Sequence, residues 1–278
     1  MSDTANIAAL DTLGIIAGNR TLPLLLAKEA RCSGIGRLVA VAFEGETDPI
    51  LTDLVDDIEW IRVGQLARMI KAFKSRGVTQ CVMVGQIAPK NLFDLRPDLR
   101  AMALLMRLKE KNAHTLFGGI AEELAKDGIT LIEAIPWLQP AMPGKGFSWG
   151  PDVTAKQQSA IGFAHEIATE ISRLDIGQIV VVKDGAVLAV EGFEGTDRCL
   201  ARGGELAGKD GGAVAVKVAK ADHDMRFDIP CIGAKTIETC AKSGISVLAF
   251  EAGRALLLEQ ETCERLAKEH KISVTTIG

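Results

Sequence analysis

Seven ionisable side chains gather in one short segment that directly follows an apolar run. The run Gly212–Val216 predicts a strand, and the segment from Lys217 to Gly233 then passes a rigid Pro230. A strand that ends in this way positions charged side chains in a binding or catalytic site. Carboxylates there can hold a metal ion or orient water, and cations can neutralise phosphates. The seven are Lys217, Lys220, Asp222, His223, Asp224, Arg226 and Asp228.

Asp228 is the acidic residue of this segment for which we expect burial. It lies between Phe227 and Ile229, and a buried carboxylate has to be paired or metal-bound. A structural salt bridge with Arg226 is the alternative that we rank second. We interpret Asp222 and Asp224 as solvated loop charges.

Two further segments combine polar groups with helix-end signals. Glu194-Gly195-Thr196-Asp197 predicts a helix start at which Thr196 caps and Asp197 opposes the helix dipole, which leaves Glu194 unexplained. The stretch from Arg173 through Asp175 to Gln178 predicts a helix end with Gly177 near the left-handed cap position.

Glycines mark two predicted strand ends in the first half of the chain. Gly14-Ile-Ile-Ala-Gly18-Asn19-Arg20 places small residues and a cation where a strand meets a helix, and backbone N–H groups at such a point favour an anion. A glycine that merely eases the turn explains Gly18 about as well. Gly85-Gln86 ends another strand at the same predicted sheet edge. Neither a dinucleotide fingerprint nor a phosphate-binding P-loop is present.

The elements that must position these groups divide into two lobes, as a chain of 278 residues permits. In residues 1–136, apolar runs such as Gln80–Val84 alternate with helical patterns, which predicts a Rossmann-like parallel sheet. Residues 137–152 are rich in proline and glycine and predict a linker. Residues 153–278 predict a mixed α/β domain, in which strands over Gln178–Lys183 and Ala186–Glu191 flank a hairpin turn at Asp184-Gly185 and a helix follows near Thr196–Leu206. The fold class is α/β.

Composition excludes several partners and compartments. A formal net charge of −4 and a pI near 5.7 give no basic field for nucleic acid. The six cysteines have no CxxC spacing and most lie among apolar neighbours, which indicates a reducing, cytoplasmic compartment. We expect neither a secretion signal nor a spanning helix.

These motifs together resemble the UDP-2,3-diacylglucosamine pyrophosphatases of the LpxI type, over nearly the whole chain. The resemblance implies hydrolysis of UDP-2,3-diacylglucosamine to 2,3-diacylglucosamine 1-phosphate (lipid X) and UMP in lipid A synthesis, with Mg²⁺, substrate binding between the lobes, a transient inner-membrane contact and a homodimer. It implies catalytic roles for Asp228, Glu194 and Lys217, and metal ligation by Asp228 and Asp197. The implied substrate-binding residues are Gly18, Asn19, Gly85, Gln86, His114, Asp175, Gln178, Gly195, Thr196, Arg226 and Gly233.

The sequence departs from the family pattern at two places. Asn112-Ala113-His114 stands where members usually carry Gly-Asp-Asp, and His223 replaces a glutamine. A catalytically altered protein of the same family that binds a nucleotide sugar or lipid is therefore the alternative. A nicotinamide-dependent oxidoreductase ranks lower, since neither the dinucleotide fingerprint nor an acidic residue at the end of the second strand, Leu38–Phe43, is in the expected place, and Glu44 is the nearest candidate.

Acyl chains of a lipid substrate require an apolar surface. The amphipathic segment Ala101–Met106 predicts an ordinary core-facing helix, and it is also our candidate for acyl chains or a membrane surface. Trp137, Phe147 and Trp149 in the linker are the other candidates, at the mouth of a cleft.

Overall fold

The computed structural model describes residues 10–87, 97–108, 113–219, 224–227 and 229–278. These residues form two compact units, which divide between Leu138 and Gln139. Residues 224–227 belong with the first unit, although the expected boundaries placed all of 153–278 in one domain. The α/β class is confirmed, with a parallel sheet in the first unit and a mixed sheet in the second.

The sheet of the first unit has the strand order β3-β2-β1-β4-β5, and every pairing is parallel. Strands β1, β2 and β4 are largely continuous apolar runs, as a sheet covered on both faces requires, whereas the edge strand β3 carries Asp57 and Glu59. Because β1 lies between β2 and β4, the strand order reverses beside β1, which is where open α/β sheets bind ligands. The strands are β1 (Thr12–Ala17), β2 (Arg37–Phe43), β3 (Asp57–Ile61), β4 (Gln80–Val84) and β5 (Thr130–Leu131).

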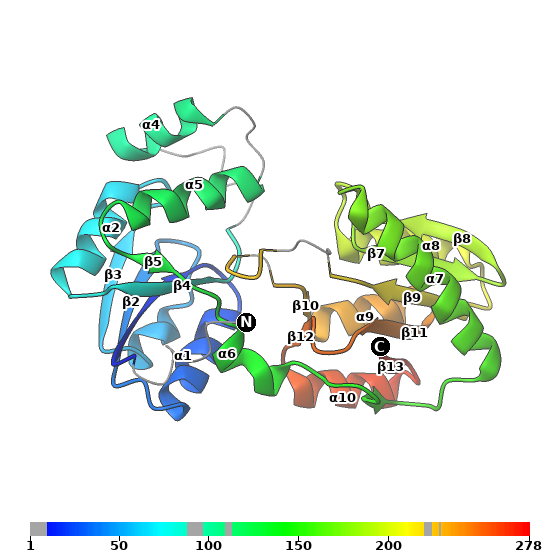
Figure 1. Ribbon diagram of the computed structural model, residues 1–278. Helices are drawn as coiled ribbons and strands as arrows, with labels where there is room; N and C mark the ends of the chain where they lie inside the picture. Colours follow the sequence, from blue (N-terminus) through cyan, green and yellow to red (C-terminus); the bar gives the residue numbers. More distant parts are fainter. Residues whose placement is uncertain (1–9, 88–96, 109–112, 220–223, 228) are drawn as a thin grey trace. The chain divides into compact units, whose positions relative to one another are not determined.

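Helices cover both faces of this sheet (Figure 1). One face packs against α2 (Leu66–Ser75) and α5 (Ala113–Ala125), and α4 (Leu99–Arg107) packs on these two helices. The other face packs against α1 (Leu22–Cys32), on which the short α6 (Ile135–Leu138) lies. The 3-10 helix η2 (Pro49–Asp53) follows β2. Phe73 of α2 is fully buried in the core. Phe227 joins this core and meets Phe117 of α5 with ring centroids 5.4 Å apart.

The second unit contains a six-stranded sheet of order β6-β13-β11-β9-β7-β8. Strands β9, β11 and β13 are parallel, whereas β7 and β6 are antiparallel to their neighbours. The predicted hairpin turn is confirmed, since Asp184 and Gly185 both have positive φ, 49° and 79°. The strands are β6 (Ser148–Trp149), β7 (Ile179–Lys183), β8 (Ala186–Val190), β9 (Ala213–Lys217), β11 (Ile245–Glu251) and β13 (Ser273–Ile277), beside the separate pair β10 (Cys231–Ile232) and β12 (Leu256–Leu257).

Alternate residues of these strands point to opposite faces, and each face has its own helices. Val180, Val214 and Val247 pack against α7 (Ala155–Arg173). Val181 and Ala215 pack on the other face against α8 (Thr196–Leu206), α9 (Ala234–Lys242) and α10 (Gln260–Glu269). Both faces of the sheet are therefore buried.

The three linker aromatic residues pack on or in the cores: Trp137 is buried, and Phe147 and Trp149 are partly buried against the core of the second unit, so their apolar surface is used within the fold and does not support the prediction that they line the mouth of a cleft. Trp137 of α6 is 2% exposed. Phe147 meets Trp149 at 4.7 Å and Phe250 at 6.3 Å between ring centroids. Trp149 belongs to β6, which pairs with β13, so burial of these rings anchors the start of the second unit.

Candidate active site

Three charged residues stand where strands of the second sheet end. Lys217 is the last residue of β9, Glu251 is the last of β11, and Glu191 directly follows β8. Strands β8, β9 and β11 run in the same direction, because β7 is antiparallel to both β8 and β9. Their carboxyl ends therefore share one edge of the sheet, where α/β folds place ligands.

Glu191 connects this edge to the start of α8. Its Oε2 accepts the backbone N–H of Gln178 at 2.9 Å, and its Oε1 accepts the hydroxyl of Thr196 at 3.0 Å. The residue is 8% exposed, so the carboxylate meets the requirement that buried charge be hydrogen-bonded. Glu191 thereby holds Gln178 and Thr196, two predicted substrate-binding residues, in one arrangement.

Lys217 is the buried cation of this arrangement, with 9% of its surface exposed. Its Nζ donates to Thr196 Oγ1 at 3.3 Å and to the carbonyl oxygen of Cys231 at 3.2 Å. An ammonium group has three hydrogens, and within the described residues these two acceptors are neutral. A third hydrogen of this ammonium group can be donated to an anionic ligand.

Glu194 and Asp197 each have a cationic partner. Glu194 accepts from Arg202 at 2.5 Å and from the backbone N–H of Gly192 at 3.0 Å. The hydrogen bond from Arg202 is the main reason that the pKa of Glu194 lies below its ordinary value. Asp197 accepts from Lys235 Nζ at 2.8 Å.

The helix ends in this region differ from the predicted ones. Gly195, with φ 84°, is the N-cap of α8, and Thr196 is free of that role because its hydroxyl donates to Glu191. At the end of α7 the residue in the left-handed conformation is Asp175, with φ 59°. Gly177 does not have a positive φ, so it is not the left-handed cap. Gly177 is required for another reason, since a Cβ there would lie 2.1 Å from the carbonyl oxygen of Glu191. Gly233 is the N-cap of α9.

In the first unit, the two predicted glycine loops lie against each other. Asn19 and Gln86 form an antiparallel bridge in which Asn19 N donates to Gln86 O at 2.7 Å, and Gly18 N donates to Val84 O at 2.8 Å. A Cβ on Gly18 would lie 2.5 Å from Gln86 O, and Gly85 has φ 89°. These N–H groups are used within the chain, so an anion has to find other donors here.

Asn19 carries a buried side-chain oxygen that can accept a hydrogen bond from a ligand. Its Nδ2 donates to Glu46 Oε2 at 2.5 Å, whereas its Oδ1 is buried and has no hydrogen-bond partner among the described residues. Such an oxygen costs free energy unless a donor reaches it. The side chain therefore supports a binding role for the Gly18-Asn19 loop.

Arg226 forms a bidentate pair with Asp224, at 2.8 Å from Nε to Oδ1 and 2.6 Å from Nη2 to Oδ2. The hydrogen bonds to Asp224 raise the pKa of Arg226. The interpretation of Asp224 as a solvated loop charge is wrong, because its side chain is only 19% exposed. Asp228, Asp222 and His223 lie outside the described residues, as does the side chain of His114, whose backbone is in the first turn of α5.

Comparison with known proteins decides the family. The model of the LpxI N-terminal domain matches residues 12–140, and that of the LpxI C-terminal domain matches residues 144–275. The chain belongs to the LpxI family. It is 31% identical over 259 residues to the UDP-2,3-diacylglucosamine pyrophosphatase LpxI of Caulobacter vibrioides, covering 90% of this chain and 91% of the relative. That relative is named as a pyrophosphatase.

Solved structures add no argument to the LpxI assignment. The biotin carboxylase domain of a thermophilic 2-oxoglutarate carboxylase is 15% identical, with a TM-score of 0.28 over 64% of this chain and 36% of that one. A biotin carboxylase from Campylobacter jejuni is 12% identical, with a TM-score of 0.28 over 73% and 43%. The chain thus spans less than half of either protein, and the likeness is too low to carry inference.

The described residues of this LpxI family member do not by themselves form a metal site. No group of three or more His, Cys, Asp or Glu side chains capable of holding an ion occurs in the part that the structure describes. Asp197, one of the two predicted ligands, is paired with Lys235, and Asp228 lies outside the described residues.

Sequence reasoning missed Glu191 as a site residue. The sequence predicts a strand over Ala186–Glu191 and so treats Glu191 as its last member, without a role. The signal that was available is a lone carboxylate at the end of an apolar strand, directly before Gly192. Burial of such a group at a strand end favours a functional or organising role.

Proposed function

We propose that this protein hydrolyses the pyrophosphate of UDP-2,3-diacylglucosamine during lipid A biosynthesis. Water forms a bond to one of the two phosphorus atoms, the bridging P–O bond breaks, and UMP and 2,3-diacylglucosamine 1-phosphate (lipid X) leave. The observation that carries the proposal is 31% identity to an LpxI pyrophosphatase across 90% of the chain, with both LpxI domains matched.

The buried Lys217 supplies the chemistry that such a substrate needs. A diphosphate in a site of low dielectric is stabilised by a fixed cation, and more so as charge develops in the transition state. Lys217 Nζ is held by Thr196 and Cys231 without a described carboxylate partner, so its charge is directed to the phosphates.

We assign activation of the attacking water to Asp228 and not to Glu194. A general base works best when its pKa lies near the working pH. The lowered pKa of Glu194 makes that carboxylate a poor proton acceptor, so its role is to hold Arg202 and the Gly192 backbone beside the site.

We propose that the protein uses Mg²⁺, held by carboxylates together with the phosphates of the substrate. This ion is usually held by one or two carboxylates together with substrate phosphates, and it supplies charge neutralisation when bound. Asp228 and Asp197 are the carboxylates that we assign to it, and ion binding at Asp197 requires that the Lys235 pair open. Removal of divalent ions with EDTA, followed by titration with magnesium, tests this assignment.

The experiment for the activity is product analysis with purified protein and UDP-2,3-diacylglucosamine. We expect equal amounts of UMP and 2,3-diacylglucosamine 1-phosphate by mass spectrometry. Tight binding of the substrate without product would overturn the proposal and favour the catalytically altered, binding-only relative that Asn112-Ala113-His114 suggests.

A membrane contact is proposed on the exposed face of α4. No helix among the described residues is long and apolar enough to cross a membrane. On α4, however, Leu99 is 84% and Met106 is 82% exposed, with Met102 on the same face. Apolar side chains presented in this way insert into lipid surfaces. We therefore propose a cytoplasmic protein that touches the inner membrane while it takes its lipid substrate.

The membrane contact is tested by vesicle sedimentation with the double variant Leu99→Ser, Met106→Ser, against Leu206→Ser as a matched control on α8. We expect loss of vesicle binding in the double variant alone, and equal binding of both variants would contradict the membrane contact.

A homodimer is proposed from the family resemblance, and light scattering in solution tests it.

A further inference from the structure

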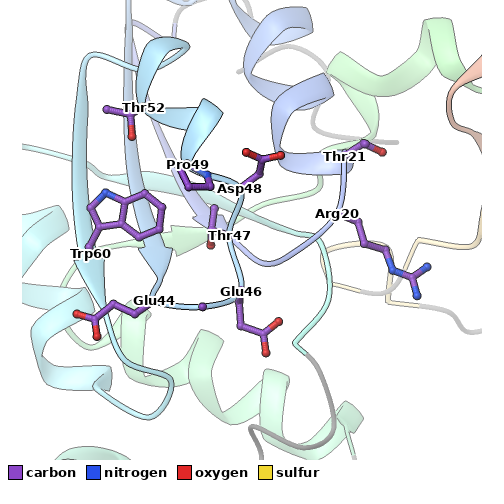
Figure 2. Close-up of a pocket in the computed structure, with 10 residues that line it drawn as sticks. Arg20, Thr21, Glu44, Glu46, Thr47, Asp48, Pro49, Thr52 and Trp60 are labelled. Atoms are coloured by element: carbon purple, nitrogen blue, oxygen red, sulfur yellow. The ribbon is translucent and has the colours of Figure 1, made fainter.

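Carboxylates stand at the carboxyl ends of strands in both sheets, and they differ in the groups that they hold. In the first sheet, Glu44 and Glu46 follow β2 and line an open depression (Figure 2). Both accept hydrogen bonds from side chains, Glu44 from Arg62 at 3.4 Å and Glu46 from Asn19 at 2.5 Å. In the second sheet, Glu251 ends β11 and accepts a hydrogen bond from the backbone. Glu251 therefore holds the main chain in place.

The hydrogen bond of Glu251 is made where the chain leaves β9. Its Oε2 accepts from the backbone N–H of Ala219 at 2.6 Å, and Ala219 is 7% exposed. The preceding amide is held as well, since Val218 N donates to Gln178 O at 2.9 Å. Two successive N–H groups beyond the last residue of β9 are thus fixed. The segment that carries Asp228 comes next in the sequence.

The carboxylate of Glu251 lies between cationic side chains. Its Oε1 is 3.9 Å from His165 Nε2 on α7 and 3.8 Å from Arg254 Nη1, and the Glu251 side chain is 20% exposed. A hydrogen bond to an ionised acceptor is about twice as strong as one between neutral groups. Ala219 is therefore anchored more firmly than a hydrogen bond from one backbone group to another would anchor it.

The chain that follows Glu251 holds the other end of the same segment. Leu256 N, in β12, donates to the carbonyl oxygen of Pro230 at 2.8 Å, directly before β10. Pro230 is buried, and β12 pairs with β10 in parallel. One short stretch, residues 251–257, therefore fixes the segment that carries Asp228 on both sides, through Glu251 before it and through β12 after it.

We propose that Glu251 is a positioning residue for hydrolysis of the pyrophosphate. By holding the Ala219 N–H, it fixes the point from which the chain continues to Asp228, to which we assign activation of the attacking water. Lys217 and Thr196 are held by other bonds, so Glu251 acts on water activation and not on phosphate binding. Misplacement of a reacting group by about 1 Å can cost about a hundredfold in rate. The inference rests on the proposed function, since it needs Asp228 to act on water.

Steady-state kinetics with UDP-2,3-diacylglucosamine tests the positioning role. Glu251→Ala removes the acceptor, and we expect kcat to fall by about tenfold to a hundredfold while KM stays close to that of wild type. Glu251→Gln keeps an acceptor oxygen of the same reach and is expected to retain most of the rate. The matched control is Asp56→Ala, which removes a carboxylate that accepts Leu38 N at 2.7 Å at the amino end of β2. That variant should lose stability and keep the wild-type kcat.

Amide hydrogen exchange gives a readout that needs no turnover. We expect the Ala219 N–H to exchange faster in Glu251→Ala than in wild type, whereas the Val218 N–H, held by Gln178 O, stays protected. Thermal melting of each variant checks folding. If the alanine variant does not fold, Glu251→Asp replaces it, because the shorter side chain withdraws the carboxylate from Ala219 by one methylene.

The outcomes separate the positioning role from the proposed function. UMP release by wild type with an unchanged kcat in folded Glu251→Ala refutes the positioning role alone. An equal loss of kcat in Asp56→Ala, or a Glu251→Gln protein as slow as Glu251→Ala, refutes it as well, because the loss would then not follow the bond to Ala219. No release by wild type refutes the proposed function, and the positioning role with it.

Discussion

Thr196 donates its hydroxyl hydrogen to Glu191 at 3.0 Å, and the same hydroxyl oxygen accepts from Lys217 at 3.3 Å. A buried carboxylate and a buried ammonium thus share one hydroxyl without touching each other. Direct pairing would have neutralised Lys217. The hydroxyl keeps both charges hydrogen-bonded and leaves the ammonium able to bind a phosphate.

Substitution Glu191→Gln is expected to destabilise the second unit. An amide can offer its oxygen to either the Gln178 N–H or the Thr196 hydroxyl but not to both as the carboxylate does. The loss is about 1.5–3 kcal/mol in the free energy of unfolding, the usual range for hydrogen bonds to charged groups. Urea denaturation measures it. The exposed Glu205→Gln on α8 is the control, and equal stability of the two variants would contradict the account.

The glycine contact beside β1 gives a second stability prediction. Gly85→Ala places a Cβ 2.7 Å from Asn19 O on a backbone with φ 89°, so it is expected to destabilise by about 1–3 kcal/mol. Gly118→Ala is the matched control. Its Cβ has open space inside α5, and we expect it to stabilise by about 0.5–1 kcal/mol. Thermal melting of both variants checks the opposite signs, and a Gly85→Ala protein as stable as wild type would be the contrary result.

Glu123 gives the first unit a pH-dependent component of stability. Hydrogen bonds from Lys126 and then from Arg100 hold the pKa of Glu123 below its ordinary 4.5. A lowered pKa contributes stability that is complete above the ordinary value and is lost as pH falls through the lowered one. Glu123→Gln should therefore be less stable than wild type at pH 7, and the difference should shrink below pH 4.5. The exposed neighbour Glu122→Gln should show almost no such change in urea titrations.

Buried thiols should be unreactive in the folded protein. Burial raises the pKa of Cys199, Cys240 and Cys263 to about 12, and it raises that of Cys81 as well. Cys32, by contrast, is exposed. A thiol-reactive dye at pH 8 is expected to label Cys32 first, and Cys32→Ser should remove that fast phase. Cys231 is only partly buried, so the decisive protein carries both Cys32→Ser and Cys231→Ser, and fast labelling that persists there would show that a buried cysteine is accessible.

The sheet strands could be predicted closely because their apolar runs are continuous and end at glycines or charges. The run Gln80–Val84, for example, matches β4 at both ends. Helix α8 is predicted near Thr196–Leu206, the range observed, although its N-cap is Gly195 and not the predicted Thr196.

The remaining features depend on contacts between distant residues. Nothing local indicates that residues 224–227 return to the first unit, since the reason is Phe227 packing on Phe117. Nor does spacing indicate that Glu191 binds Thr196, or that Asp224 pairs with Arg226 in a partly buried position. These are tertiary contacts, and they override the structural preferences that each residue has by itself.

The rate of UMP release from UDP-2,3-diacylglucosamine by wild type, Lys217→Met and Asp228→Ala tests the central claim most directly. The methionine keeps the length and packing of Lys217 and removes its charge, while Lys209→Met, an exposed lysine, is the control. We expect kcat to fall by about a hundredfold or more in Lys217→Met, as when one electrostatic stabiliser is removed, and release to be abolished in Asp228→Ala. Wild-type rates in a folded Lys217→Met or Asp228→Ala protein would contradict the account.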